Sequence, residues 1–146
     1  AARMLTFLLD NGIHSYVELK SKQEQITNAF NEARSNIKLV ETRINELTVI
    51  VKKLGTIQGF SETTPPSQNQ ILIKDAAIKF LLSKDIHPPY PDIADIASQI
   101  VGLHAQKESL YGIYYSLRKN RREFSTVQKN VDMLLQRRIT TGLEKE

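Results

Sequence analysis

A regular alternation of apolar and polar positions runs through residues 19–54. Apolar side chains recur there at alternating steps of four and three, and Gln23 is the one polar residue in the series. A repeat kept without a slip over about five heptads is typical of a helix that pairs with another helix along one seam. We therefore predict a long helix over 15–54, with Ile37 and Ile44 buried at the middle of its seam.

Capping signals mark the two ends of this predicted helix. Ser15 and Glu18 have the spacing of a capping box, which satisfies free amides at a helix N-terminus. Gly12 suits the left-handed turn that ends a preceding helix, so the stretch 1–11 is expected to be the end of such a helix. Two glycines in the stretch 55–66 are expected to end the long helix, and this stretch is expected to form a loop.

The second half of the chain repeats this organisation in a weaker form. A second capping box predicts a shorter helix over 67–84, and the proline-rich sequence "DIHPPYP" predicts a stiff connector after it. A second heptad pattern then predicts a long helix over 92–138. Three positions of its seam are polar: Lys107, Arg121 and Gln128.

These elements predict an all-α fold. The two long helices are expected to form a long antiparallel coiled-coil hairpin, with the shorter helix packed near its tip. We expect 1–146 to be a single helical domain. Because the sequence starts without methionine and inside a predicted helix, we expect it to be a fragment of a larger protein.

The net charge of the chain is +4, and the excess is confined to its last third. Residues 104–146 carry nine basic and five acidic side chains, whereas the remainder of the chain is balanced. This asymmetry favours a polyanionic partner. The sequence has no cysteine, which excludes disulfides, and no apolar run of the roughly 18 residues that span a bilayer. We expect a cytoplasmic protein without membrane insertion.

Catalytic and metal-binding patterns are missing from the sequence. The three histidines, His14, His87 and His104, are too far apart to chelate a metal from one helical turn. No glycine-rich phosphate loop or nucleophile motif occurs. We therefore expect no catalytic residue, no metal site and no cofactor.

The last predicted helix carries one pattern that points to a ligand. On a helix, Tyr111, Tyr115, Arg118 and Arg122 follow one another along one face, with Lys119 beside them. Aromatic rings next to basic groups are what a single-stranded nucleic acid requires, because bases stack on the rings and phosphates pair with the cations. We call these five residues the stripe and predict that it is a DNA-binding site.

Three short sequences resemble the helical C-terminal region of MobA/MobL-type relaxases, the mobilisation proteins of bacterial integrative and conjugative elements. They are "NGIHSYVEL" at 11–19, "AAIKFLL" at 76–82, and the segment 110–135 with "LYGIYYSLRK" and "KNVDMLL". The resemblance spans roughly residues 7–135. Two loops depart from the family pattern, since "HPPYP" stands where a glycine- and lysine-rich turn is expected and the loop after Leu54 is short.

The resemblance implies a non-catalytic helical arm of a conjugative relaxase. The nicking chemistry of the family uses a histidine cluster, a divalent metal and a tyrosine in an N-terminal domain, and none of those motifs occurs in this chain. The arm would support DNA processing and transfer by contacting single-stranded DNA, relaxosome proteins or secretion-channel proteins. An alternative from another class is a coiled-coil scaffold that binds a protein partner and has no nucleic-acid role. The sequence does not predict an oligomeric state.

Overall fold

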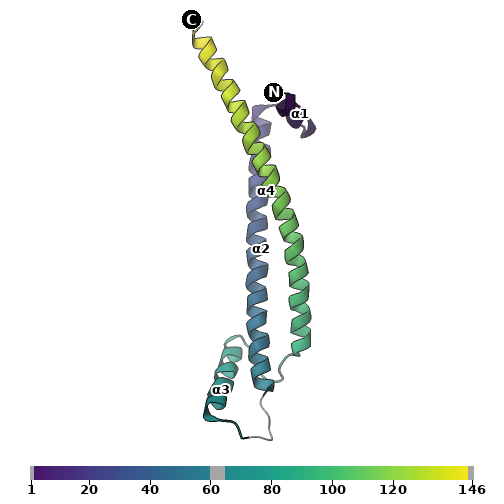
Figure 1. Cartoon of the computed structure of the whole chain (residues 1–146), viewed down its shortest axis with the longest axis vertical. Helices are drawn as coiled ribbons and strands as arrows, with labels where there is room; N and C mark the ends of the chain where they lie inside the picture. Colours follow the sequence, from purple (N-terminus) through teal and green to yellow (C-terminus); the bar gives the residue numbers. More distant parts are fainter. Residues whose placement is uncertain (1, 60–64, 145–146) are drawn as a thin grey trace. The chain divides into compact units, whose positions relative to one another are not determined.

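The computed structural model describes residues 2–59 and 65–144, which form four helices (Figure 1). They are α1 (Ala2–Asp10), α2 (Tyr16–Gln58), α3 (Gln68–Ser83) and α4 (Ile93–Glu144). No strand occurs within the described residues. The predicted all-α fold, with two long antiparallel helices and a shorter helix near the tip of the pair, is confirmed.

The end of α2 corrects one sequence-based prediction. The helix continues through Gly55 to Gln58, although we expected the first glycine to end it. Glycine within a helix costs only about 1 kcal/mol relative to alanine, and Ile57 lies beyond it against a hydrophobic core. Within the predicted loop 55–66, residues 60–64 lie outside the described residues. At the other end of the pair, α4 extends beyond the predicted limit of residue 138.

The chain divides into two compact units, and both long helices contribute to each. Unit 1 consists of residues 1–36 and 110–146, and unit 2 consists of residues 37–109. The predicted domain 1–146 therefore contains two hydrophobic cores, one in each unit.

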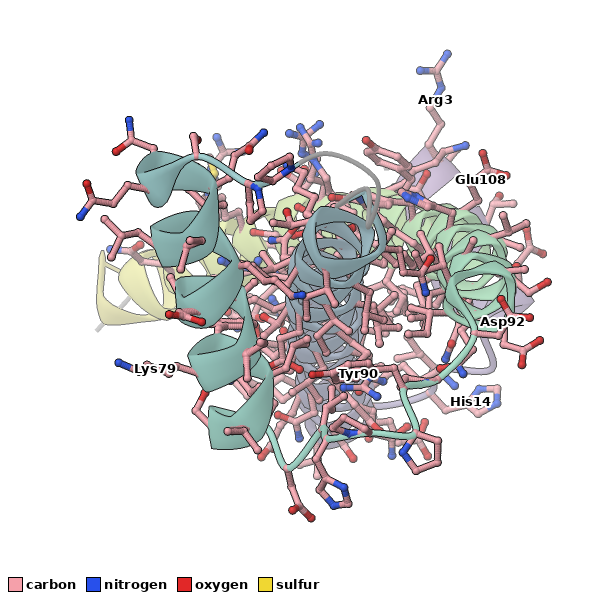
Figure 2. The ribbon with its side chains drawn as sticks, turned by 90° about the horizontal axis from the view of Figure 1, so that it is seen from below. Arg3, His14, Lys79, Tyr90, Asp92 and Glu108 are labelled. Atoms are coloured by element: carbon pink, nitrogen blue, oxygen red, sulfur yellow. The ribbon has the colours of Figure 1, made fainter. Side chains whose placement is uncertain are left out.

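Unit 2 is built where the end of α2 meets α3 and the start of α4. Its hydrophobic core contains Leu47, Ile50, Leu54, Leu81 and Ile96. Further along the two long helices, the Lys107 ammonium lies 3.4 Å from a carboxylate oxygen of Glu41, which gives a polar seam position a charged partner. Figure 2 shows Lys79 pointing outward from α3, while Tyr90 of the connector lies under the end of α2 and packs against this core.

The predicted seam of α2 is buried where it was expected to be. Ile37 and Ile44 are each 7% exposed. Ile50 lies outside the seam and is buried as well, because α3 supplies apolar side chains to the core that contains it. A third helix therefore widens the buried face beyond what pairing of two helices requires.

Unit 1 is built where the start of α2 meets α1 and the later part of α4. Ile13, Leu19, Phe124 and Val127 form its core. The Phe7 and Phe124 rings meet edge to face, with their centroids 4.9 Å apart, which attaches α1 to α4. At the margin of this core, the Tyr16 hydroxyl donates a hydrogen bond of 2.7 Å to Asp132.

Of the two predicted capping boxes, the one at the start of α3 forms completely and the one at the start of α2 forms in part. The Ser67 hydroxyl accepts from the Gln70 amide, and the Gln70 side chain accepts from the Ser67 amide, as in a complete capping box. At the start of α2 the Ser15 hydroxyl accepts from the Glu18 amide, but the Glu18 carboxylate accepts from the His14 amide instead of the Ser15 amide. At the start of α2, the Glu18 side chain therefore bonds the amide one residue before the one that it bonds in a standard capping box.

The two units share a similar short sequence and the same helix-ending turn, which the heptad pattern does not predict. The sequence "FLLDNGIHSY" at 7–16 is echoed by "FLLSKDIHPPY" at 80–90. In each copy a helix ends in a left-handed residue, Gly12 (φ 66°) or Asp85 (φ 59°). The isoleucine that follows, Ile13 or Ile86, donates its amide to a leucine carbonyl five residues earlier at 2.8 Å.

This arrangement is a Schellman motif, which ends a helix and places the next apolar residue against it. In both units that residue is an isoleucine that packs against the hydrophobic core. A tyrosine that packs against the same core follows three or four residues later, at the first residue of α2 in unit 1 and shortly before α4 in unit 2. Each unit is therefore a short helix, a Schellman turn and the start of a long helix, closed by the end of the other long helix.

The left-handed conformation of Gly12 leads to a paired prediction. Gly12→Ala should lower the free energy of unfolding by about 1 kcal/mol, because a Cβ at φ 66° is strained although no atom lies within 4 Å of it. Gly112→Ala should raise it by about 0.8–1 kcal/mol, because this glycine lies inside α4 with open space around the position of a Cβ. Urea unfolding followed by circular dichroism measures both. Two substitutions with the same sign would contradict the assigned backbone conformations.

Candidate nucleic-acid interface

Four aromatic rings gather where α2 and α4 pair in unit 1. Phe30 of α2 stacks on Tyr114 of α4, with centroids 5.1 Å apart and an angle of 26° between the rings. Tyr111 stacks on Tyr115, one helical turn later, at 5.9 Å. Tyr114 and Tyr115 meet edge to face at 5.4 Å, so the four rings form one continuous cluster.

The rings of this cluster differ in their access to solvent. Phe30 is 5% exposed and forms its buried base. Tyr111 and Tyr114 are half-buried, whereas Tyr115 is 57% exposed. Tyr115 is therefore the ring with the most surface available to an incoming base, and its contact with Tyr111 holds it in place.

The stripe predicted from the sequence lies on α4 as expected, but not all of it is exposed. Lys119 and Arg122 are exposed, while Tyr111 and Arg118 are half-buried. Tyr111 is partly covered by the neighbouring rings of Tyr114 and Tyr115. The structure therefore keeps the five residues together on one side of α4 while presenting three of them most openly: Tyr115, Lys119 and Arg122.

Two further arginines reach the cluster, and sequence reasoning did not place them there. The Arg121 guanidinium lies over the Phe30 ring at 4.8 Å from its centroid, and Arg34 lies over the same ring at 5.9 Å. Arg121 comes from α4 and Arg34 from α2. The four-residue spacing between Phe30 and Arg34 is a detectable signal, but the approach of Arg121 depends on how the two helices align.

The cations of this region have no acidic partner within the described residues. Two ion pairs are present in unit 2, where Arg43 lies 3.3 Å from Glu46 and Lys107 lies 3.4 Å from Glu41. The sequence of unit 1 contains twelve basic and eight acidic residues, whereas unit 2 contains eight of each, so the net charge of +4 belongs to unit 1. Five cations near the tyrosine cluster take part in no ion pair among the described residues: Arg34, Arg118, Lys119, Arg121 and Arg122.

Unit 1 also carries an apolar groove beside α1. Its volume is about 430 Å³, and it is lined mainly by leucine side chains of α1 together with Ile13, Leu19, Val131 and Leu135. Leu5 and Leu9 are each 58% exposed at this groove. Its polar lining comes from the turn before α2 and from Tyr16. Such a surface suits an apolar segment of a protein better than a nucleic acid.

The described residues contain neither a cluster of metal ligands nor a membrane-spanning helix. Among residues 2–59 and 65–144, no three His, Cys, Asp or Glu side chains are placed to hold one metal ion. His14, His87 and His104 are exposed and come from different elements. None of the described helices has the length and apolar character needed to cross a bilayer.

Comparison with protein-family models, with curated proteins and with solved structures gave no match for this chain.

Proposed function

We propose that this chain is a non-catalytic helical arm of a conjugative relaxase, and that unit 1 contacts single-stranded DNA through the stripe. The observation that carries this proposal is the group of cations without acidic partners around the tyrosine cluster. A group of cations beside the exposed ring of Tyr115 favours an anionic ligand that carries aromatic bases. The resemblance of three sequence segments to relaxases, which process DNA, also supports a DNA ligand.

The geometry suggests how each residue type would contribute. The guanidiniums of Arg118 and Arg122 would pair with phosphates, and Lys119 would add a point charge to the same side of α4. Tyr115 would offer its ring to a base, supported from behind by Tyr111. Bases in a duplex are already stacked on their neighbours, so a stacking surface favours a single strand.

A salt titration separates the two kinds of contact. The double substitution Arg118→Ala and Arg122→Ala should lower the slope of log affinity against log salt by about 1.4, since each phosphate contact on a single strand contributes about 0.7. Tyr115→Ala should weaken binding by about 1–3 kcal/mol with little change in slope, because stacking releases no counterion. Fluorescence anisotropy of a labelled single-stranded oligonucleotide at several salt concentrations measures both effects.

Lys79→Ala is the matched control, because this lysine points outward from α3 in unit 2 (Figure 2). It should leave the slope and the affinity unchanged. Absence of binding at low salt, or equal effects of the control and the stripe variants, would remove the stripe as the DNA site.

The second candidate function is a scaffold that binds a protein partner, and the apolar groove of unit 1 favours it. A leucine-lined groove with two exposed leucines at its margin could receive the apolar face of a partner helix from a relaxosome or secretion-channel protein. This function does not need the unpaired cations around the tyrosines, and for that reason we rank it second.

A further inference from the structure

The Phe30 ring gathers two arginines from two different helices of unit 1. The guanidiniums lie 4.8 and 5.9 Å from the same ring centroid, so they are at most about 11 Å apart. That separation is comparable to the screening length of about 10 Å in 0.1 M salt, so the two positive charges still repel each other weakly. Neither has a carboxylate partner among the described residues. An anion near both guanidiniums would remove this repulsion.

The ring also restricts the two side chains before any ligand arrives. Phe30 is 5% exposed and is stacked on Tyr114, so its position is fixed by the packing of α2 against α4. A guanidinium lying over an aromatic ring is attracted by the ring electrons and loses part of its rotational freedom. Arginines that are already restricted lose less entropy when they pair with a ligand.

We infer that Arg34 of α2 and Arg121 of α4, held on the Phe30 ring, form a phosphate clamp for single-stranded DNA. This inference rests on the proposed function and extends its site from one helix to two. A phosphodiester strand that stacks a base on Tyr115 would have its neighbouring phosphates within reach of the clamp, because Tyr115, Tyr114 and Phe30 form one continuous ring cluster. The guanidinium is suited to this role because its planar donors pair with two phosphate oxygens at once.

An ordinary packing role is the competing explanation. Long arginine side chains often cover apolar rings at the edge of a helix pair and contribute to stability through their methylene groups. In that case Arg34 and Arg121 would influence the melting temperature and would not influence the salt dependence of DNA binding. The two explanations therefore differ in a measurable quantity.

The test compares Arg34→Gln, Arg121→Gln and the double variant with Arg43→Gln. Arg43 is the matched control, because it is an arginine of α2 that lies in unit 2 and is already paired with Glu46. Binding to a labelled oligothymidylate is measured by fluorescence anisotropy across a salt series. Each single clamp variant should lower the salt slope by about 0.7, and the double variant by about 1.4. At fixed salt, affinity should fall about threefold to tenfold for each lost guanidinium, and the control should bind like the wild type.

Arg121→Lys adds a readout that packing alone would not change. It should recover the salt slope, since the charge is kept, while affinity stays below that of the wild type because an ammonium does not pair with two oxygens in a plane. A duplex of the same length serves as competitor and should bind more weakly than the single strand. Circular dichroism melts of every variant show whether folding is intact.

The outcomes separate the clamp from the proposed function. If the wild type does not bind the oligonucleotide at low salt, both are rejected. If it binds and the Arg118 and Arg122 variants lose salt slope while the Arg34 and Arg121 variants match the Arg43 control, the DNA function stands and the clamp is rejected. The clamp is also rejected if Arg34→Gln and Arg121→Gln lower the melting temperature without changing the slope. A loss of slope in folded Arg34→Gln, on a helix that carries none of the stripe, supports the clamp.

Discussion

Leu54→Ala is expected to lower the free energy of unfolding by about 3–5 kcal/mol. This leucine is 0% exposed and lies in the core of unit 2, where α2, α3 and α4 meet. Removing its side chain leaves a cavity surrounded by three helices, and such a site cannot collapse by shifting one element. Urea unfolding followed by circular dichroism at 222 nm gives the free energy directly.

Leu39→Ala provides the control on the same helix. Leu39 is 69% exposed, so losing its side chain should change the free energy of unfolding by no more than about 0.5 kcal/mol. If the two substitutions were equally costly, α2 would be rotated about its axis relative to the arrangement described above. A small effect of Leu54→Ala alone would mean that α3 does not close this core.

Phe124→Ala should have a similarly large effect in unit 1, about 3–5 kcal/mol. Phe124 is 3% exposed, and its ring meets Phe7 of α1 edge to face at 4.9 Å. Without this ring, α1 loses its main aromatic contact with α4. We therefore expect faster proteolytic cleavage near Gly12 in addition to the lower stability, and both can be followed on the same preparation.

Phe124→Leu separates burial from the ring contact. Leucine retains most of the apolar volume but loses the edge-to-face pair, so a cost of about 1 kcal/mol is expected. Cleavage near Gly12 should then stay close to the wild-type rate. An equal cost for leucine and alanine would show that shape, and not buried area, dominates at this position.

The heptad pattern predicts the pairing face of α2 well because it is a local property of the sequence. Residues such as Ile37 and Ile44 recur at the spacing that one helix needs to face another, and both are buried. The same pattern does not predict burial of Ile50 or Val127. These residues are buried in cores to which a third helix contributes, and a repeat written along one helix contains no information about that helix.

In the candidate site, too, features that depend on one helix are predicted from the sequence, whereas contacts between helices are not. The stripe follows from the spacing of tyrosines and arginines on one helix, and its members lie together on α4. Arg121 lies over the Phe30 ring because of how α2 and α4 are aligned along their length. The heptad pattern does not determine this alignment, because it is a property of each helix by itself. The echo between "FLLDNGIHSY" and "FLLSKDIHPPY" was available in the sequence, and it identifies both short-helix turns without any structure.

The division into two units has a consequence for the order in which the protein folds on the ribosome. Unit 2 is made from one continuous stretch of chain, residues 37–109, so all of its core residues are synthesised before residues 110–146, which complete unit 1. Unit 1 joins residues 1–36 to residues 110–146, so α1 and the start of α2 must wait for Phe124 and Val127 to be synthesised. At about 5–20 residues per second, this interval lasts on the order of several seconds. During that time Leu19 and Phe30 are without the side chains of α4 that pack against them in the folded unit.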